Sequence, residues 1–365
     1  MNKVLILGGY GNFGKRIARA LVMHGVPVII AGRSHEKAES FNHTLPSALS
    51  SIAVFDVKHD LSAQLKTLKP VVAINTCGPF QTSNYNVAQA CIEAGVHYID
   101  LADGRDFVTG INTLDQQAKQ KSVVVISGAS TLPGLSSAVL EKYKDEFSEI
   151  ESLVFGISPG QRAQRGLATT QAIMTYVGKP LKVFAGINTP VYGWQNIYLQ
   201  EYPELGKRWM ANCDIPDLDL LPLRYGIRSI RFSAGLELSF MHIGLWLSSW
   251  LVRAGVPLNL LGHATTLLKI SNWFNGFGTA DGGMHMIIRG KDKTGNTHVC
   301  RWFIIGKNGA GPQIPCIPAI ILAKKLASAI PLNTGAYPCV GLISLEEYLS
   351  ELKNFDIRQM RVLDG

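Results

Sequence analysis

The chain of 365 residues contains few charged residues and few cysteines for its length. Only 17% of its residues are charged and 47% are hydrophobic, which excludes an intrinsically disordered protein and allows a large core. Its six cysteines form no CxxC pair, so we expect neither a disulfide framework nor a zinc site. No set of His, Cys, Asp and Glu has metal-ligand spacing. We therefore predict no metal, reduced thiols and a cytoplasmic location.

The sequence also lacks a basic run and an apolar run long enough to span a membrane. The excess of 35 Lys and Arg over 27 Asp and Glu is spread along the chain, which fits an anionic ligand and does not indicate a nucleic-acid partner. Residues 238–252 and 254–268 contain no Lys, Arg, Asp or Glu, but each stretch is shorter than the roughly 20 residues of a spanning helix. We interpret them as a buried helix pair, in the core or at a homodimer interface. The alternative is that Trp246, Trp250 and Arg253 contact a membrane surface or line a tunnel for a lipophilic substrate.

The first 130 residues contain a regular alternation of strand and helix patterns. Short apolar runs typical of buried strands lie near residues 4–7, 26–33, 51–56, 71–80, 97–102 and 122–129, and most are separated by segments with helical spacing. The first run meets a glycine turn, so we expect a strand there and not a signal peptide. The alternation predicts an α/β fold, a doubly wound parallel sheet of the Rossmann type.

A GxGxxG motif joins the first predicted strand to the first predicted helix. In this position the first glycine is expected to allow a tight turn, the second the approach of a pyrophosphate, and the third the packing of helix on strand. The N-terminus of the helix then directs free N–H groups at the phosphates. The motif therefore predicts a dinucleotide site lined by Gly9, Tyr10, Gly11, Asn12, Phe13 and Gly14.

The end of the second predicted strand indicates which dinucleotide is bound. An NAD site usually has a carboxylate there, but this strand ends with Arg33 and Ser34. An arginine can pair with the 2′-phosphate and stack on adenine, and the serine hydroxyl can donate a hydrogen bond to it. We therefore predict NADP(H), the alternative being a solvated arginine without a ligand.

Later strand ends are expected to complete the cofactor cleft, because ligands bind outside the carboxyl ends of parallel strands. Asp56 and Val57 follow the third strand and are expected near the adenine. The segment after the fourth strand is expected near the nicotinamide ribose and consists of Thr76, Cys77, Gly78 and Pro79. We interpret Cys77 as a small residue beside the nicotinamide and not as a nucleophile.

Candidates for proton transfer follow the fifth and sixth predicted strands. Asp103 is the first choice for an acid, a base or a substrate-binding carboxylate, and the alternative is that it caps the following turn or helix. Tyr98 and Thr131 are the other two candidate catalytic residues. Two arginine clusters in the middle third, Arg162 with Arg165 and Arg224 with Arg228 and Arg231, could recognise an anion, but solvated loops are the default interpretation.

Five segments resemble the saccharopine dehydrogenase-like NADP-binding family, most closely its uncharacterised oxidoreductase branch: "GGYGNFG", "AGRS", "NTCGPF", "HYIDLADGRDF" and "SGASTLPGLSS". The resemblance implies an NADP-binding Rossmann domain over residues 1–132. It also implies an α+β substrate and dimerisation domain over 133–312 and a segment, 313–365, that packs back on the Rossmann domain. A homodimer is expected from the same resemblance.

The sequence favours an NADP(H)-dependent oxidoreductase that transfers hydride to or from a small or lipophilic carbonyl, imine or enoyl substrate. One alternative is a saccharopine-type amino-acid dehydrogenase. The other is a sensor or scaffold protein that binds NADP(H) without turnover, because the sequence shows no compelling catalytic pair.

Overall fold

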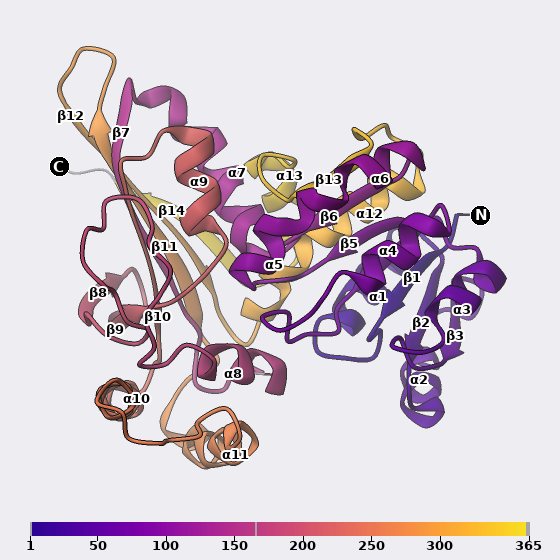
Figure 1. Cartoon of the computed structure of the whole chain (residues 1–365), viewed down its shortest axis with the longest axis horizontal. Helices are drawn as coiled ribbons and strands as arrows, with labels where there is room; N and C mark the ends of the chain where they lie inside the picture. The colour runs from indigo at the N-terminus through magenta and orange to yellow at the C-terminus, as the bar shows by residue number, and fades with distance from the viewer. Residues whose placement is uncertain (1, 165, 363–365) are drawn as a thin grey trace. The chain divides into compact units, whose positions relative to one another are not determined.

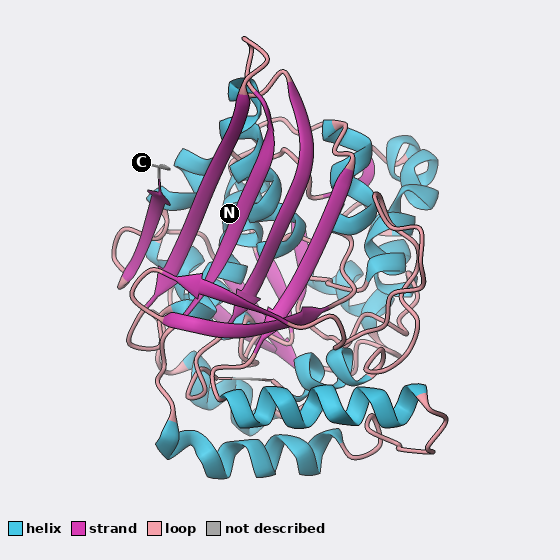
Figure 2. Cartoon of the chain, turned by 90° about the vertical axis from the view of Figure 1, so that its left-hand side faces the viewer, coloured by secondary structure: helices cyan, strands magenta, loops and turns pink. Residues whose placement is uncertain are grey.

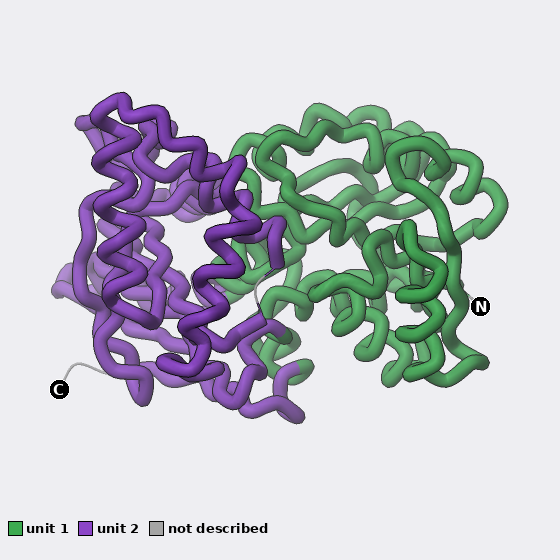
Figure 3. Tube along the Cα trace, turned by 90° about the horizontal axis from the view of Figure 1, so that it is seen from below, with its two compact units in different colours: residues 1–138, 313–351 green, residues 139–312, 352–365 purple. Residues whose placement is uncertain are grey.

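The computed structural model describes residues 2–164 and 166–362, which form two compact units (Figure 1, Figure 3). Unit 1 comprises Met1–Ala138 and Gln313–Glu351, and unit 2 comprises Val139–Pro312 and Leu352–Gly365. These limits differ from the predicted ones in two places. Residues 133–138 belong to unit 1, and the segment from Leu352 onward belongs to unit 2.

Unit 1 contains a seven-stranded sheet in the order β13-β6-β5-β4-β1-β2-β3, and its strand pairs are all parallel. Apolar runs buried on both faces form most of these strands, as a parallel sheet requires. The predicted Rossmann fold is confirmed, and the late segment adds one strand to it. The strands are β1 (Val4–Leu7), β2 (Val28–Gly32), β3 (Ser50–Val54), β4 (Val72–Asn75), β5 (His97–Asp100), β6 (Val124–Ser127) and β13 (Gly335–Pro338).

Helices cover the sheet of unit 1 because each has one apolar face. In α1, Ile17, Leu21 and Val22 are buried at helical spacing, and Gly25 follows the helix in the left-handed region. In α12, which has Pro318 in its first turn, apolar residues are buried along almost the whole length. The helices are α1 (Gly14–Met23), α2 (His35–Asn42), α3 (Leu61–Leu68), α4 (Asn86–Glu93), α5 (Arg105–Thr109), α6 (Asp115–Gln120), α12 (Ile317–Ala327) and α13 (Leu345–Ser350), with α7 (Ser136–Tyr143) crossing into unit 2.

Unit 2 is built on a second seven-stranded sheet, of mixed direction, in the order β14-β12-β11-β7-β10-β9-β8 (Figure 2). Only β7 and β10 are paired in parallel, and the other pairs are antiparallel. The strands are β7 (Glu149–Ser158), β8 (Tyr198–Tyr202), β9 (Gly206–Asn212), β10 (Ser229–Gly235), β11 (Gly282–Lys291), β12 (Thr297–Gly306) and β14 (Ile357–Val362).

The last strand, β14, does not follow the expectation that residues 313–365 all return to unit 1. It pairs with β12 of unit 2. Trp302 donates a hydrogen bond from its indole N–H to Gln359 at 2.8 Å, and Arg361 forms an ion pair with Glu146 at 2.6 Å. The strand therefore satisfies backbone groups along the edge of β12, a long-range pairing without a local sequence signal.

The helices of unit 2 are α8 (Leu167–Met174), α9 (Asp217–Tyr225), α10 (Ser239–Arg253) and α11 (Ala264–Trp273). We expected the charge-free stretches of α10 and α11 to be buried, either in the core or at a homodimer interface. The structure contradicts burial in the core of this chain. Only His242 and Ser249 of α10, and Ala264 and Ser271 of α11, are buried. The fully buried side chains of these helices are small or polar. The apolar composition therefore did not predict which face of each helix packs against the rest of unit 2. No helix in the described ranges is long and apolar enough to cross a membrane.

Candidate cofactor and active site

The carboxyl ends of the strands in unit 1 lie along one edge of the sheet. Leu7 of β1 is in register with Ala31 of β2 and with Asn75 of β4, and Asn75 is in register with Asp100 of β5. Because β1 lies between β2 and β4, the strand order reverses at this point, where doubly wound sheets form their ligand crevice. All four segments predicted to bind the cofactor follow these strand ends.

The glycine loop begins one residue earlier than the GxGxxG motif suggests. Gly8 has a φ of +76°, and a Cβ there would lie 2.7 Å from the hydroxyl oxygen of Thr76. Gly9, which we predicted to allow the tight turn, is the second residue of the turn that the N–H of Gly11 closes on Gly8, and the left-handed residue is Gly8. Gly9 is restricted by packing instead, since a Cβ there would lie 2.9 Å from Cγ2 of Ile30.

The rest of the loop folds around the carbonyl oxygen of Gly8. The backbone N–H of Gly11 donates to this oxygen at 2.8 Å, and a Cβ on Gly14 would overlap it. Helix α1 starts at Gly14, and no side chain caps its N-terminus. The positive end of its dipole therefore meets the glycine loop without a capping side chain, an arrangement that suits a pyrophosphate.

The end of β2 is shaped by Tyr10 as well as by the predicted arginine and serine. The Tyr10 ring lies over Gly32, where a Cβ would come within 2.7 Å of the phenolic oxygen. That oxygen accepts a hydrogen bond from the Ser34 backbone N–H at 2.9 Å, and the Ser34 hydroxyl oxygen accepts one from the N–H of Lys37 at 3.3 Å. Ser34 keeps its hydroxyl hydrogen for donation, and Arg33 is exposed beside it. These groups fit a 2′-phosphate.

The segment after β4 lies against the glycine loop. The Thr76 hydroxyl donates to the carbonyl oxygen of Leu7 at 2.8 Å, and the N–H of Cys77 donates to the side-chain oxygen of Asn75 at 3.0 Å. Although part of Cys77 is exposed, desolvation by the surrounding protein raises the pKa of its thiol to about 11, with Arg33 lowering it and Asp56 raising it. The residue is therefore a thiol at neutral pH, which disfavours a nucleophile.

Tyr98, a predicted catalytic residue, lies in the core below the site. Its side chain is buried, and its hydroxyl oxygen accepts a hydrogen bond from the Asn75 amide at 3.1 Å. Burial raises the pKa of Tyr98 well above its usual range. The same Asn75 accepts the N–H of Cys77, so hydrogen bonds through this side chain connect Tyr98 to the segment after β4.

Asp103 and Thr131 both lie in loops at the carboxyl edge of the sheet. Asp103 is half-buried, and its Oδ1 accepts a hydrogen bond from the Gln81 amide at 3.0 Å. Burial raises the pKa of Asp103, and the bond from Gln81 partly offsets this effect. Helix α5 has Gly104 at its N-cap and no side-chain cap, so Asp103 does not serve as the cap. Thr131 is buried at the first position of the helical turn Thr131–Leu135.

Asp100 is a residue whose importance the sequence analysis missed. It is fully buried, and its Oδ1 accepts hydrogen bonds from the N–H of Ala102 (3.0 Å), the N–H of Gly128 (2.8 Å) and the hydroxyl of Ser127 (2.9 Å). Its Oδ2 is buried without a hydrogen-bond partner among the described residues. Burial raises the pKa of Asp100 to about 6, against the effect of these donors. One carboxylate thus fixes the loops that follow β5 and β6. In the sequence, the only sign of this role is that a charged residue ends an apolar strand.

We expect Asp100→Asn to change how the free energy of unfolding depends on pH. Because the folded-state pKa is raised from its ordinary value of 3.8, the stabilising contribution of the protonated carboxyl is complete below about pH 4 and is lost as the pH rises through about 6. As the pH rises from 4 to 7, the free energy of unfolding of the variant should increase by about 2–4 kcal/mol relative to that of the wild type. Denaturant unfolding of both proteins across this range measures the difference, and a difference independent of pH would contradict the assignment.

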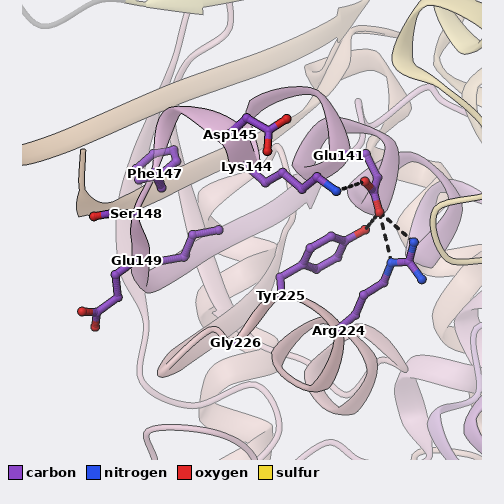
Figure 4. A pocket seen from close by; sticks show the side chains of 10 residues that line it. Glu141, Lys144, Asp145, Phe147, Ser148, Glu149, Arg224, Tyr225 and Gly226 are labelled. Atoms are coloured by element: carbon purple, nitrogen blue, oxygen red, sulfur yellow. Dashed lines mark hydrogen bonds and ion pairs between the residues drawn. The ribbon is translucent and has the colours of Figure 1, made fainter. Parts of the chain in front are cut away.

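A surface pocket in unit 2 is lined by charged residues that pair with one another (Figure 4). Glu141 accepts hydrogen bonds from Arg224 at 2.9 Å and from the hydroxyl of Tyr225 at 2.9 Å, and it forms an ion pair with Lys144 at 2.6 Å. Burial raises the pKa of Glu141, but the hydrogen bonds from these cationic and phenolic groups outweigh it and lower the pKa. The pocket is therefore held by an internal ion cluster and does not resemble a site for chemistry.

Two further arginines of unit 2 have partners, and two of its histidines are buried. Arg228 pairs with Glu149, and Arg162 donates to the carbonyl oxygen of Asn275 at 2.9 Å, while Arg165 lies outside the described residues. Burial lowers the pKa of His242 to about 4 and that of His285 to about 3, so both are neutral at physiological pH. Within the described ranges, no three His, Cys, Asp or Glu side chains are grouped to hold a metal ion.

Comparison with known families identifies the N-terminal unit. Residues 4–126 match the model of the saccharopine dehydrogenase NADP-binding domain, a range that includes every predicted cofactor segment. Over this part of its length the chain is similar to the NADP-binding domain of saccharopine dehydrogenase. Both the predicted resemblance and the predicted cofactor, NADP(H), are confirmed. The glycine loop, the uncapped α1 and the exposed Arg33 described above fit this cofactor.

Similarity to solved structures extends over both units of the chain. Saccharopine dehydrogenase (L-Glu forming) from Saccharomyces cerevisiae has a TM-score of 0.68 and 13% identity, with 100% of each chain covered. Amine dehydrogenase from Mycobacterium smegmatis has a TM-score of 0.50 and 11% identity, covering 93% of this chain and 94% of its own. At these identities the similarity establishes the fold. A search of curated protein sequences finds no significant match.

Proposed function

We propose that the protein is an NADP(H)-dependent oxidoreductase that transfers hydride to or from a carbonyl, imine or enoyl carbon of a small or lipophilic substrate. The observation that supports this most directly is the NADP-binding domain over residues 4–126. A buried, polar set of groups at the same sheet edge, built on Asp100 and Asp103, supports an enzyme over a cofactor-binding scaffold.

The residues described above would hold NADP(H) in a defined orientation. The amides of the glycine loop and α1 would bind the pyrophosphate, and Arg33 and Ser34 the 2′-phosphate. Residues 76–79 would flank the nicotinamide ribose, with Tyr98 and Asn75 fixing their backbone. The bound cofactor supplies or accepts the hydride.

Proton transfer in this proposal is assigned to Asp103. Burial raises the pKa of its carboxyl, so the group can exchange a proton closer to neutral pH than an exposed aspartate can. Gln81 donates to Oδ1 and orients the carboxyl, which leaves Oδ2 to hold or release a proton at the substrate heteroatom. Thr131 would contact the substrate from the neighbouring loop.

The proposal is tested by following NADPH absorbance with a panel of aldehydes, ketones, imines and enoyl thioesters. With a substrate found in this way, Asp103→Asn should lower kcat by about 10²–10⁴-fold because general acid–base catalysis contributes that much. Its affinity for NADPH should stay unchanged, and Glu93→Gln, an exposed carboxylate on α4, should behave like the wild type.

The panel also separates the two alternatives. Consumption of NADPH only with an aldehyde-derived imine of glutamate would identify a saccharopine-type amino-acid dehydrogenase. Tight NADPH binding without consumption by any member would contradict the enzyme proposal and favour a sensor or scaffold.

A further inference from the structure

Helices α10 and α11, the connection between them and the turn after them expose ten large apolar side chains. Figure 1 labels both helices, and in Figure 2 they are the two helices along the lower edge of the picture, below the sheet of unit 2. The exposed side chains, which we call the apolar surface, are those of Phe240, Leu247, Trp250, Leu251, Val256, Leu258, Leu261, Ile270, Trp273 and Phe277. Trp273 and Phe277 are 76% and 77% exposed. A concentration of this kind marks a surface that contacts an apolar partner.

The polarity of the two helices is inverted relative to an ordinary amphipathic helix. His242, Ser249 and Ser271 are buried while the apolar side chains face outward. His242 accepts a hydrogen bond from the N–H of Leu236 at 3.4 Å, and its ring lies 5.1 Å from that of Trp194. The buried polar side chains contact the rest of unit 2, and the side chains of the apolar surface are at least 38% exposed among the residues that the structure describes.

Specific contacts hold both helices in place, so the exposed surface is a built feature. The guanidinium of Arg253 lies 3.9 Å from the ring centre of Tyr192 and donates to the side-chain oxygen of Gln195 at 2.8 Å. The side-chain amide of Gln161 donates to the carbonyl oxygen of Ser271 at 2.7 Å. These contacts fix α10 at its C-terminal end and α11 near its C-terminal end.

The charge of residues 238–280 distinguishes between two partners for the apolar surface, a second copy of the chain and a lipid bilayer. From residue 238 to residue 280 the sequence contains Arg253 and Lys269 but no Asp or Glu. Packing against a second copy would bring these cations near their own equivalents without a carboxylate to balance them. Anionic lipid headgroups provide that balance. Exposed Trp250 and Trp273 are also of the type that concentrates at membrane interfaces.

We propose that the apolar surface binds peripherally to an anionic lipid bilayer, with α10 and α11 lying in the plane of the interface. At 15 and 10 residues the two helices are too short to span a bilayer, which agrees with an in-plane position. The proposal is independent of the cofactor site, because every residue of the apolar surface belongs to unit 2.

Vesicle co-sedimentation of the full chain tests this proposal. The protein should sediment with vesicles of equal parts phosphatidylcholine and phosphatidylglycerol, and less with phosphatidylcholine alone. The double variant Trp273→Ser, Phe277→Ser should bind the anionic vesicles with a partition coefficient at least about tenfold lower, because it removes two large apolar side chains from the contact. Lys269→Glu should weaken binding only to the anionic vesicles.

A matched control replaces two apolar residues that are equally exposed elsewhere, Met23→Ser and Leu223→Ser, at 82% and 85% exposure. It should sediment like the wild type, and circular dichroism should show all variants folded, because none of the substituted side chains is buried. Failure of the wild type to bind vesicles would overturn the proposal, as would equal loss in the control. A dimer in light scattering that the double variant dissociates, without vesicle binding, would show that a second copy covers the surface instead.

Discussion

Replacing Arg33 with aspartate is expected to abolish the preference of the protein for NADPH over NADH. Arg33 is exposed at the end of β2, beside the turn that Tyr10 and Ser34 hold in place. A hydrogen bond to a charged group contributes about 1.5–3 kcal/mol, so its loss corresponds to about a 10- to 150-fold change in the ratio of the two affinities. Repulsion between the new carboxylate and the 2′-phosphate adds to this effect. Titration of wild type and variant with both reduced cofactors measures the ratio.

The matched control for this experiment is Lys66→Asp, which makes the same change of charge at an exposed position on α3. Its cofactor preference should equal that of the wild type, because Lys66 does not follow a strand end. An Arg33→Asp variant with unchanged preference would show that the arginine is only a solvated residue, and the 2′-phosphate would have to be bound elsewhere.

Substitution of Gly14 by alanine is expected to weaken binding of both cofactors together. A Cβ at this position would overlap the carbonyl oxygen of Gly8, so α1 must move away from the loop. Overpacking of this kind typically costs about 1–3 kcal/mol, which corresponds to about a 5- to 150-fold loss of affinity if it falls on the bound conformation. Fluorescence titration with NADPH gives the affinity, and circular dichroism shows whether the variant is folded.

Two further glycine variants make this prediction specific. Gly11→Ala brings a Cβ to 2.9 Å from the same oxygen and should produce a smaller loss of the same kind. Gly244→Ala, in α10, has open space around its Cβ and should bind NADPH like the wild type. Unchanged affinity in a folded Gly14→Ala variant would contradict the role assigned to the loop.

The Rossmann fold of unit 1 was predictable because its signals are local. Apolar runs such as residues 4–7, the helical spacing of Ile17 and Leu21, and the GxGxxG motif each lie within a few residues of the structure that they specify. The positions after the strand ends were predictable for the same reason. The role of Asp100 was not, because it depends on three donors that β6 and the loop after β5 bring to it.

Unit 2 was less predictable, since its features depend on contacts between distant segments. The pairing of β14 with β12 joins residues from Gly306 and Ile357, 51 positions apart, to Arg301 and Val362, 61 positions apart, and nothing in the sequence near Ile357 indicates it. The charge-free sequence of α10 predicted burial, yet His242 and Ser249 occupy the inner face while Phe240 and Leu247 are exposed. A composition that is apolar on most faces does not show which face meets the protein.

The most direct test of this account is a titration of the wild-type protein with NADPH and with NADH, followed by the fluorescence of the reduced nicotinamide. We expect NADPH to bind tightly and NADH to bind much more weakly. Equal affinity would contradict the assignment of Arg33 and Ser34 to the 2′-phosphate. If neither cofactor binds, the glycine loop is not a working dinucleotide site. That result would also contradict the proposed oxidoreductase activity.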